Sequence, residues 1–196
     1  DILNTDQRQK VDRYDNYLYV VLHRYMLAAG ALDLAQDQII VVVGRNLVLT
    51  FQERQSKTVE PVRQRLRAEH SKLRRGAADS LAYSLIDSVV DSYFGVIEQL
   101  NERAEVLEEE ILGKPRPAAL EGIHELKRCV SRLRRNLYPL REVVGSLYRD
   151  AGDFFTTEIQ LYLRDVYDHA VHILESLEDL RDLATGLLDV YLSTVS

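Results

Sequence analysis

The feature that most constrains the fold is a set of long apolar stripes with helical spacing. The last stripe places an apolar residue every three or four positions from Tyr162 to Tyr191, and no proline interrupts residues 156–196. A helix of about 40 residues would be about 60 Å long at about 1.5 Å per residue. Such a helix is too long for a compact domain of this size, so the sequence predicts a rod that leaves its domain.

Two further stripes precede this one. The first runs from Leu81 to Ile111, and the second runs from Leu120 to Leu147. Spacings of three and four alternate along the second stripe, which is typical of coiled-coil packing. Pro139 lies within it, so we expect the helix to bend or break there.

The first fifty residues have β character instead. Aromatic and β-branched residues predict strands at 17–22, 39–43 and 47–51, and Gly44-Arg45-Asn46 predicts a hairpin turn between the last two. The unbroken apolar run 39–43 predicts a strand covered on both faces. Residues 61–76 begin with proline and end with glycine, which predicts a short helix.

Composition sets the class of protein. The chain has 196 residues, of which 46% are hydrophobic and 29% charged, so it can bury a core. Its longest aliphatic run has five residues, which is too short for a membrane span. Residues 1–4 lack the basic and apolar regions of a secretory signal, so we do not expect them to form one. The first residue is not methionine, so we expect an excised piece of a longer protein. The single cysteine, Cys129, excludes an internal disulfide and fits a reducing compartment.

The net charge of −6 is distributed in blocks of opposite sign. Residues 53–75 carry +5 and residues 114–141 carry +6, whereas residues 79–110 and 142–196 carry −8 each. Antiparallel helices side by side can match such blocks. The alternation argues against nucleic-acid binding, which needs one dominant basic face. We therefore interpret the basic side chains of residues 63–75 as a solvated face.

Few residues suggest catalysis. The sequence has no nucleophile elbow, phosphate-binding glycine loop or HExxH motif. Glu121 and His124 form one ExxH motif, but di-iron bundles need two, so we interpret Glu121 as a surface residue. Cys129 lies beside two basic residues, yet a small buried helix residue is the favoured interpretation over a reactive thiol. We therefore do not expect an enzyme.

The last helix offers a candidate cation site. His169 and His172 are three residues apart and could share a face that binds zinc, although His169 also fits the apolar stripe as a hydrogen-bonded core histidine. Asp165 lies just off the stripe, with Asp168 nearby. Its carboxylate could pair with an arginine, lie in water, or meet a second carboxylate across an interface, which is unfavourable unless a cation bridges the two.

The whole chain resembles the cytoplasmic domain of the CorA family of divalent-cation channels, and most of all the magnesium transporters of that family. The segments that carry the resemblance occur in family order: Asp1-Ile-Leu-Asn4, Gln7–Val11, Phe51-Gln52-Glu53, Pro61-Val62-Arg63, Tyr83–Asp87, Val90–Phe94, Pro139–Glu142, Ser146–Asp150, Arg164–His169, Arg181-Asp182 and Gly186–Leu192.

The resemblance implies an α+β fold, with a partial α/β sheet domain, long antiparallel helices and a long stalk helix. Residues 1–76 would be the partial α/β domain, 77–151 a helical hairpin, and 152–196 the cytoplasmic part of the stalk helix. The first strands of the family domain, both membrane helices and their Gly-Met-Asn signature would lie outside this chain. The resemblance also implies a homopentamer at the cytoplasmic face of the cell membrane, and no nucleic-acid partner.

The resemblance further implies a regulatory Mg²⁺ site between subunits. Asp1 of one subunit would face Asp165 of its neighbour, and Asp87 would be a further ligand. Mg²⁺ binds oxygen ligands and keeps several waters, so its binding here would be weak and reversible. Loss of the ion would leave repelling carboxylates and loosen the closed ring. We therefore expect a Mg²⁺-sensing gating domain, with Co²⁺ as a further ion. The alternatives are a zinc transporter domain of the same superfamily and a helical scaffold without an ion role.

Overall fold

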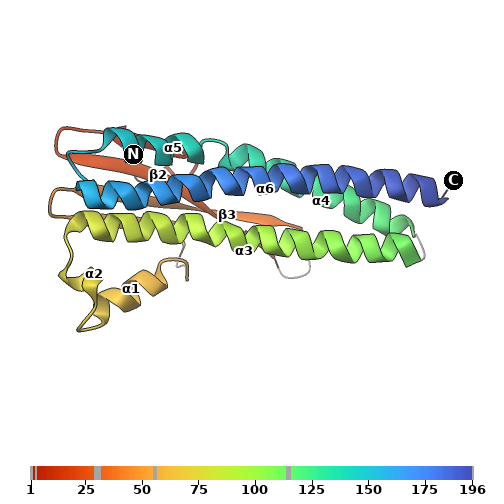
Figure 1. Ribbon diagram of the computed structural model, residues 1–196, viewed down its shortest axis with the longest axis horizontal. Helices are drawn as coiled ribbons and strands as arrows, with labels where there is room; N and C mark the ends of the chain where they lie inside the picture. The colour runs from red at the N-terminus through yellow and green to blue at the C-terminus, as the bar shows by residue number, and fades with distance from the viewer. Residues whose placement is uncertain (1, 3, 29–31, 55–56, 114–115, 196) are drawn as a thin grey trace. The chain divides into compact units, whose positions relative to one another are not determined.

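A computed structural model describes residues 2, 4–28, 32–54, 57–113 and 116–195. Four strands form one sheet in the order β1-β2-β3-β4, and Figure 1 labels its two central strands, β2 and β3. They are β1 (Lys10–Arg13), β2 (Tyr17–Leu27), β3 (Leu34–Gly44) and β4 (Val48–Gln52). The strands β1 and β2 are antiparallel, as are β3 and β4. The three predicted strands are confirmed, and a backbone hydrogen bond of 2.8 Å from Gly44 to Leu47 closes the predicted hairpin.

The sheet core lies in β2 and β3. Residues 18–25 of β2 and 37–41 of β3 are buried without interruption, so the run 39–43 is largely covered as predicted. Two of the buried side chains carry opposite charges, because Arg24 in β2 forms an ion pair with Asp37 in β3. Arg54 also approaches Asp37, with 3.6 Å between its Nε and the carboxylate oxygen Oδ1.

The short helix predicted at 61–76 is two helices in the structure. Helix α1 covers Glu60–Arg67 and helix α2 covers Lys72–Arg75. The interruption has a local cause, because Ser71 caps α2 by accepting a hydrogen bond of 3.2 Å from the backbone N–H of Leu73. A serine at an N-cap favours a new helix start over continuation of the preceding helix.

The long stripes form α3 (Ala78–Gly113), α4 (Pro117–Leu137), α5 (Leu140–Asp150) and α6 (Thr157–Val195). Helices α3 and α6 are single uninterrupted helices (Figure 1). Pro139 separates α4 from α5, which confirms the predicted break. The fold is therefore α+β, as predicted. Among the described residues, no helix is long and apolar enough to span a membrane.

The buried stripe of α6 differs from the predicted one at its start. Leu163 and Ala170 are fully buried, whereas Tyr162 and His169 are exposed. A helical period of 3.6 residues permits a step of three or four at each turn. The sequence stripe took the three-residue step from Val166 to His169, and the fold takes the four-residue step to Ala170. His169 is therefore not a core histidine.

The chain divides into two compact units. Unit 1 comprises Asp1–Tyr25, Gln36–Tyr93 and Pro139–Val171, and unit 2 comprises Met26–Ala35, Phe94–Tyr138 and His172–Ser196. In unit 1 the start of α3 is tied to the start of α6, because the buried carboxylate of Asp79 accepts hydrogen bonds from the N–H and hydroxyl of Thr156, at 3.1 and 2.8 Å. In unit 2 the helical charge blocks meet, since Arg134 of α4 pairs with Glu178 of α6 at 2.5 Å.

Candidate cation site

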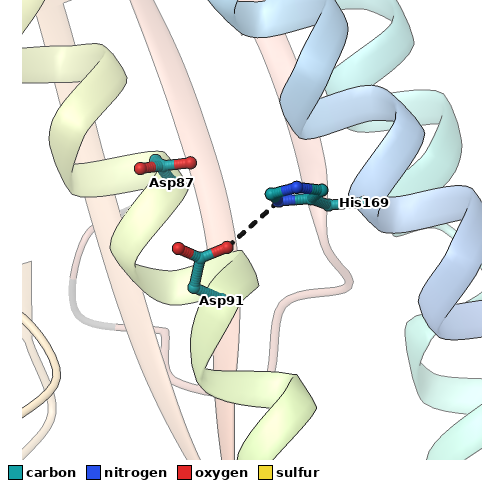
Figure 2. A group of neighbouring side chains, drawn as sticks. All are labelled: Asp87, Asp91 and His169. Carbon is teal, nitrogen blue, oxygen red and sulfur yellow. Dashed lines mark hydrogen bonds and ion pairs between the residues drawn. The ribbon is translucent and has the colours of Figure 1, made fainter.

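One face of α3 in unit 1 carries three polar side chains in consecutive turns. Tyr83, Asp87 and Asp91 are each four residues apart, so they project from the same side of the helix. The facing part of α6 supplies Tyr162, whose ring lies 5.5 Å from that of Tyr83. It also supplies His169, whose Nδ1 lies 3.1 Å from an oxygen of Asp91 (Figure 2).

Asp87, Asp91 and His169 form a cluster with the spacing of a metal site. One ligand atom of each residue lies within 4.8 Å of the others. Figure 2 shows the two carboxylates on adjacent turns of α3 and the imidazole reaching toward them from α6. Asp87 is half-buried, whereas Asp91 and His169 are exposed. Two carboxylates and one imidazole provide both the oxygen ligands that suit Mg²⁺ and the nitrogen ligand that suits Zn²⁺ or Co²⁺.

The electrostatics of the cluster favour a cation. Burial raises the pKa of Asp87, and the charge of Asp91 raises it further. His169, Arg65 of α1 and a hydrogen bond from Tyr83 act in the opposite direction without cancelling the increase. The folded chain therefore holds an ionised Asp87 at a cost, and a bound cation would remove that cost by neutralising the two carboxylates.

The same negative charges act on the phenol of Tyr83. Burial raises its pKa to about 12, with contributions from the charges of Asp87, Asp91 and Asp165. The phenol is therefore protonated at neutral pH, and its hydroxyl group can donate a hydrogen bond to Asp87. Asp165 itself is exposed on α6, one turn before His169. Its charge thus acts on the same aromatic side chain as the two carboxylates of α3.

The residues predicted for the site are placed as follows. Asp87 lies in the cluster, Asp165 lies beside it on α6, and Asp1 lies outside the described residues. Of the two histidines considered as a zinc pair, His169 lies against Asp91, and the ring of His172 lies 5.9 Å from that of Phe94. Cys129 is buried, and burial raises the pKa of its thiol, as expected for a structural cysteine. Glu121 is exposed, as predicted.

Sequence reasoning missed Tyr83 and Asp91 as members of the site. The available signal was their four-residue spacing from Asp87, which places all three side chains on one helical face. His169 was named as a possible zinc ligand, but its contact with Asp91 could not be predicted, because the two positions are 78 residues apart in the sequence.

Comparison with known proteins gives consistent matches. The family model described as CorA-like Mg2+ transporter protein matches residues 1–196. The cobalt/magnesium transport protein CorA of Thermotoga maritima is 43% identical over 196 residues, which cover all of this chain and 56% of that protein. The chain therefore spans little more than half the length of that relative.

Solved structures share the fold. The soluble domain of CorA from Methanocaldococcus jannaschii superposes with a TM-score of 0.83 at 18% identity, covering 98% of this chain and 76% of that one. The ZntB cytoplasmic domain from Vibrio parahaemolyticus superposes with a TM-score of 0.80 at 14% identity, covering 98% and 75%. At these identities the two matches establish the architecture alone.

Proposed function

The chain belongs to the family of CorA-like Mg²⁺ transporter proteins, and from that premise we propose that it is the cation-sensing cytoplasmic part of a divalent-cation transporter. In this proposal Mg²⁺ binds at Asp87 and Asp165, together with Asp1, and favours a closed, non-conducting pentamer. Co²⁺ is a second ion that the same carboxylates accept. The transporter acts through a pore at the cell membrane, and the chain itself is not an enzyme.

The observation that carries the proposal is the clustering of like charges on α3. Asp87 and Asp91 lie within 4.8 Å of a common partner, and the pKa of Asp87 is raised by burial and by Asp91. The two carboxylates repel each other, and a bound cation removes this repulsion, which makes its binding more favourable. A site of this kind responds to the free concentration of Mg²⁺, because the ion is favoured only in the arrangement that brings the carboxylates together.

The test is inhibition of transport by cytoplasmic Mg²⁺ in the full-length transporter. Asp87→Asn and Asp165→Asn remove one charge each and keep the side-chain shape, so each should raise the Mg²⁺ concentration for half-inhibition of flux by about tenfold, equivalent to about 1.4 kcal/mol. Asp168→Asn is the matched control, because Asp168 is exposed on the same helix but, unlike Asp165, is not among the charges that raise the pKa of Tyr83. Unchanged inhibition in both site variants would contradict the proposed role.

A second candidate is sensing of zinc in place of magnesium. His169 supports it, because imidazole nitrogen is a preferred zinc ligand and lies 3.1 Å from Asp91. The fold shared with the ZntB cytoplasmic domain is compatible with it. Calorimetry with Zn²⁺ and Mg²⁺ distinguishes the two. Tight Zn²⁺ binding that displaces Mg²⁺ and is lost in His169→Gln favours zinc, whereas Mg²⁺ binding that survives His169→Gln favours magnesium.

A further inference from the structure

Unit 2 contains a groove of about 970 Å³ along one face of α4. The face is strongly basic, because His124, Arg128, Arg132 and Arg135 follow one another at spacings of four, four and three residues. Lys127 also lines the groove, and Leu32 and Asp33 form its other wall. Its volume lies at the upper end of the range of about 300–1,000 Å³ that is usual for small-molecule sites.

The positive charge of this groove is only partly compensated within the chain. Arg132 contacts the backbone carbonyl of Leu34 at 3.3 Å and the carboxylate of Asp33 at 3.7 Å. In the described part of the chain, Lys127, Arg128 and Arg135 have no carboxylate within 4.0 Å. Arg134, on another side of α4, is neutralised by Glu178. Like charges four residues apart on a helix repel, so an anion beside Arg128 and Arg132 would relieve their repulsion.

The lining of the groove contains an apolar part beside its charged side chains. The described residues of its lining include two carboxylates, Glu125 and Asp33, and four arginine and lysine side chains. Leu32 and the buried side chain of Cys129 add an apolar part to the lining. Arginine guanidinium groups bind phosphate oxygens in pairs of parallel hydrogen bonds, and an apolar surface accepts a flat ring. The groove thus places a small apolar surface beside side chains that can bind phosphate oxygens.

We propose that this groove is a binding site for polyphosphate anions, with a nucleoside triphosphate as the representative ligand. Arg128 and Arg135 bind the phosphate oxygens, Lys127 supplies a further positive charge, and the apolar lining receives the base. An inorganic polyphosphate shares the phosphate contacts and lacks the base contact.

The experiment is calorimetric titration of the 196-residue chain with sodium ATP, sodium triphosphate and adenosine. The buffer contains EDTA and no divalent cation, so the result is independent of the proposed cation site. We expect ATP and triphosphate to bind and adenosine not to bind, with affinity that falls as NaCl is raised. Tighter binding of ATP than of triphosphate assigns a contact to the base, and equal binding assigns the site to the phosphate chain alone.

The variant Arg128→Gln/Arg135→Gln should weaken ATP binding by about tenfold or more, because it removes two charge-assisted contacts. Both side chains are exposed, so the fold should persist, and circular dichroism verifies it. The matched control is Arg8→Gln/Arg45→Gln, which removes the same charge from exposed positions outside the groove. The proposal is overturned if neither ATP nor triphosphate binds, or if the control variant weakens binding equally. It is also overturned if the groove variant changes only the oligomeric mass, because this face would then be an interface between copies of the chain.

Discussion

The ion pair between Arg24 and Asp37 places two charged side chains inside the sheet of unit 1. Asp37 is 1% exposed and Arg24 is 8% exposed, so both charges are removed from water. A buried pair costs several kcal/mol of desolvation per ion, which the mutual attraction roughly offsets. Removal of one partner is therefore far more damaging than removal of both.

We expect Asp37→Asn to lower the free energy of unfolding by about 3–5 kcal/mol, because it leaves the guanidinium of Arg24 buried without a counter-charge. The double variant Arg24→Met/Asp37→Leu should lose less than Asp37→Asn alone. Urea unfolding at pH 7 measures both.

Arg54→Gln is the control for this prediction. Arg54 approaches the same carboxylate, but its side chain is 67% exposed, so its loss should cost less than about 1 kcal/mol. A double variant whose loss equals or exceeds that of Asp37→Asn would show that apolar packing cannot replace the pair.

At the scale of elements, unit 2 depends on close approach between α3 and α4. Gly122 of α4 lies against Leu107 of α3, and a Cβ at position 122 would lie 2.6 Å from Cδ2 of that leucine. Leu107 is fully buried, so its side chain could move only against its packed neighbours. The glycine is therefore a packing requirement of this helix pair.

Gly122→Ala should destabilise the chain, although alanine is the better helix former. The propensity gain is about 1 kcal/mol, and overpacking of a core costs about 1–3 kcal/mol. Gly186→Ala should have the opposite sign and stabilise by about 0.5–1 kcal/mol, because Gly186 is exposed on α6 and no atom lies within 4 Å of its added Cβ. Thermal unfolding measures both, at about 2–4 °C per kcal/mol for a chain of this length. Stabilisation by both substitutions would exclude a tight contact at Gly122.

Most of these elements were predictable because their signals are local. The stripe from Leu85 to Ile111 gives the buried face of α3, and Pro139 gives the break between α4 and α5. Strand β1 was not predicted, because Lys10–Arg13 is short and mostly polar and is a strand only through its pairing with β2. Of the cation cluster, Asp87 and His169 were named from the sequence as candidate ligands, whereas Asp91 was not. The contact between Asp91 and His169 depends on how α3 meets α6, which no local pattern encodes.

At the scale of the whole molecule, charge sets the expected assembly behaviour. The chain carries a net charge of −6, and two helical blocks of −8 each contain the carboxylates of the candidate site. In the proposed assembly Asp1 of one copy meets Asp165 of another, so copies repel each other without a cation. Magnesium should therefore favour association.

We expect the chain to have its monomer mass of 22.5 kDa in EDTA and to shift toward five times that mass in millimolar Mg²⁺. Light scattering after size-exclusion chromatography measures the shift, with NaCl of equal ionic strength as the salt control. Asp165→Asn should need a higher Mg²⁺ concentration for the same shift, because it removes one of the carboxylates that bind the ion. A wild-type mass that is identical in Mg²⁺ and EDTA would contradict cation-linked association.

The buried pair of Arg24 and Asp37 also bears on how the two central strands find each other. Residues 18–25 of β2 and 37–41 of β3 are buried without the alternation that normally distinguishes one strand alignment from another. A shift of one strand by one residue would thus bury nearly the same apolar surface, but it would leave two buried charges without their partners. We therefore expect the pair to favour the correct alignment during folding. A chain with an apolar pair in its place should refold with more misaligned and aggregated product, whatever its final stability.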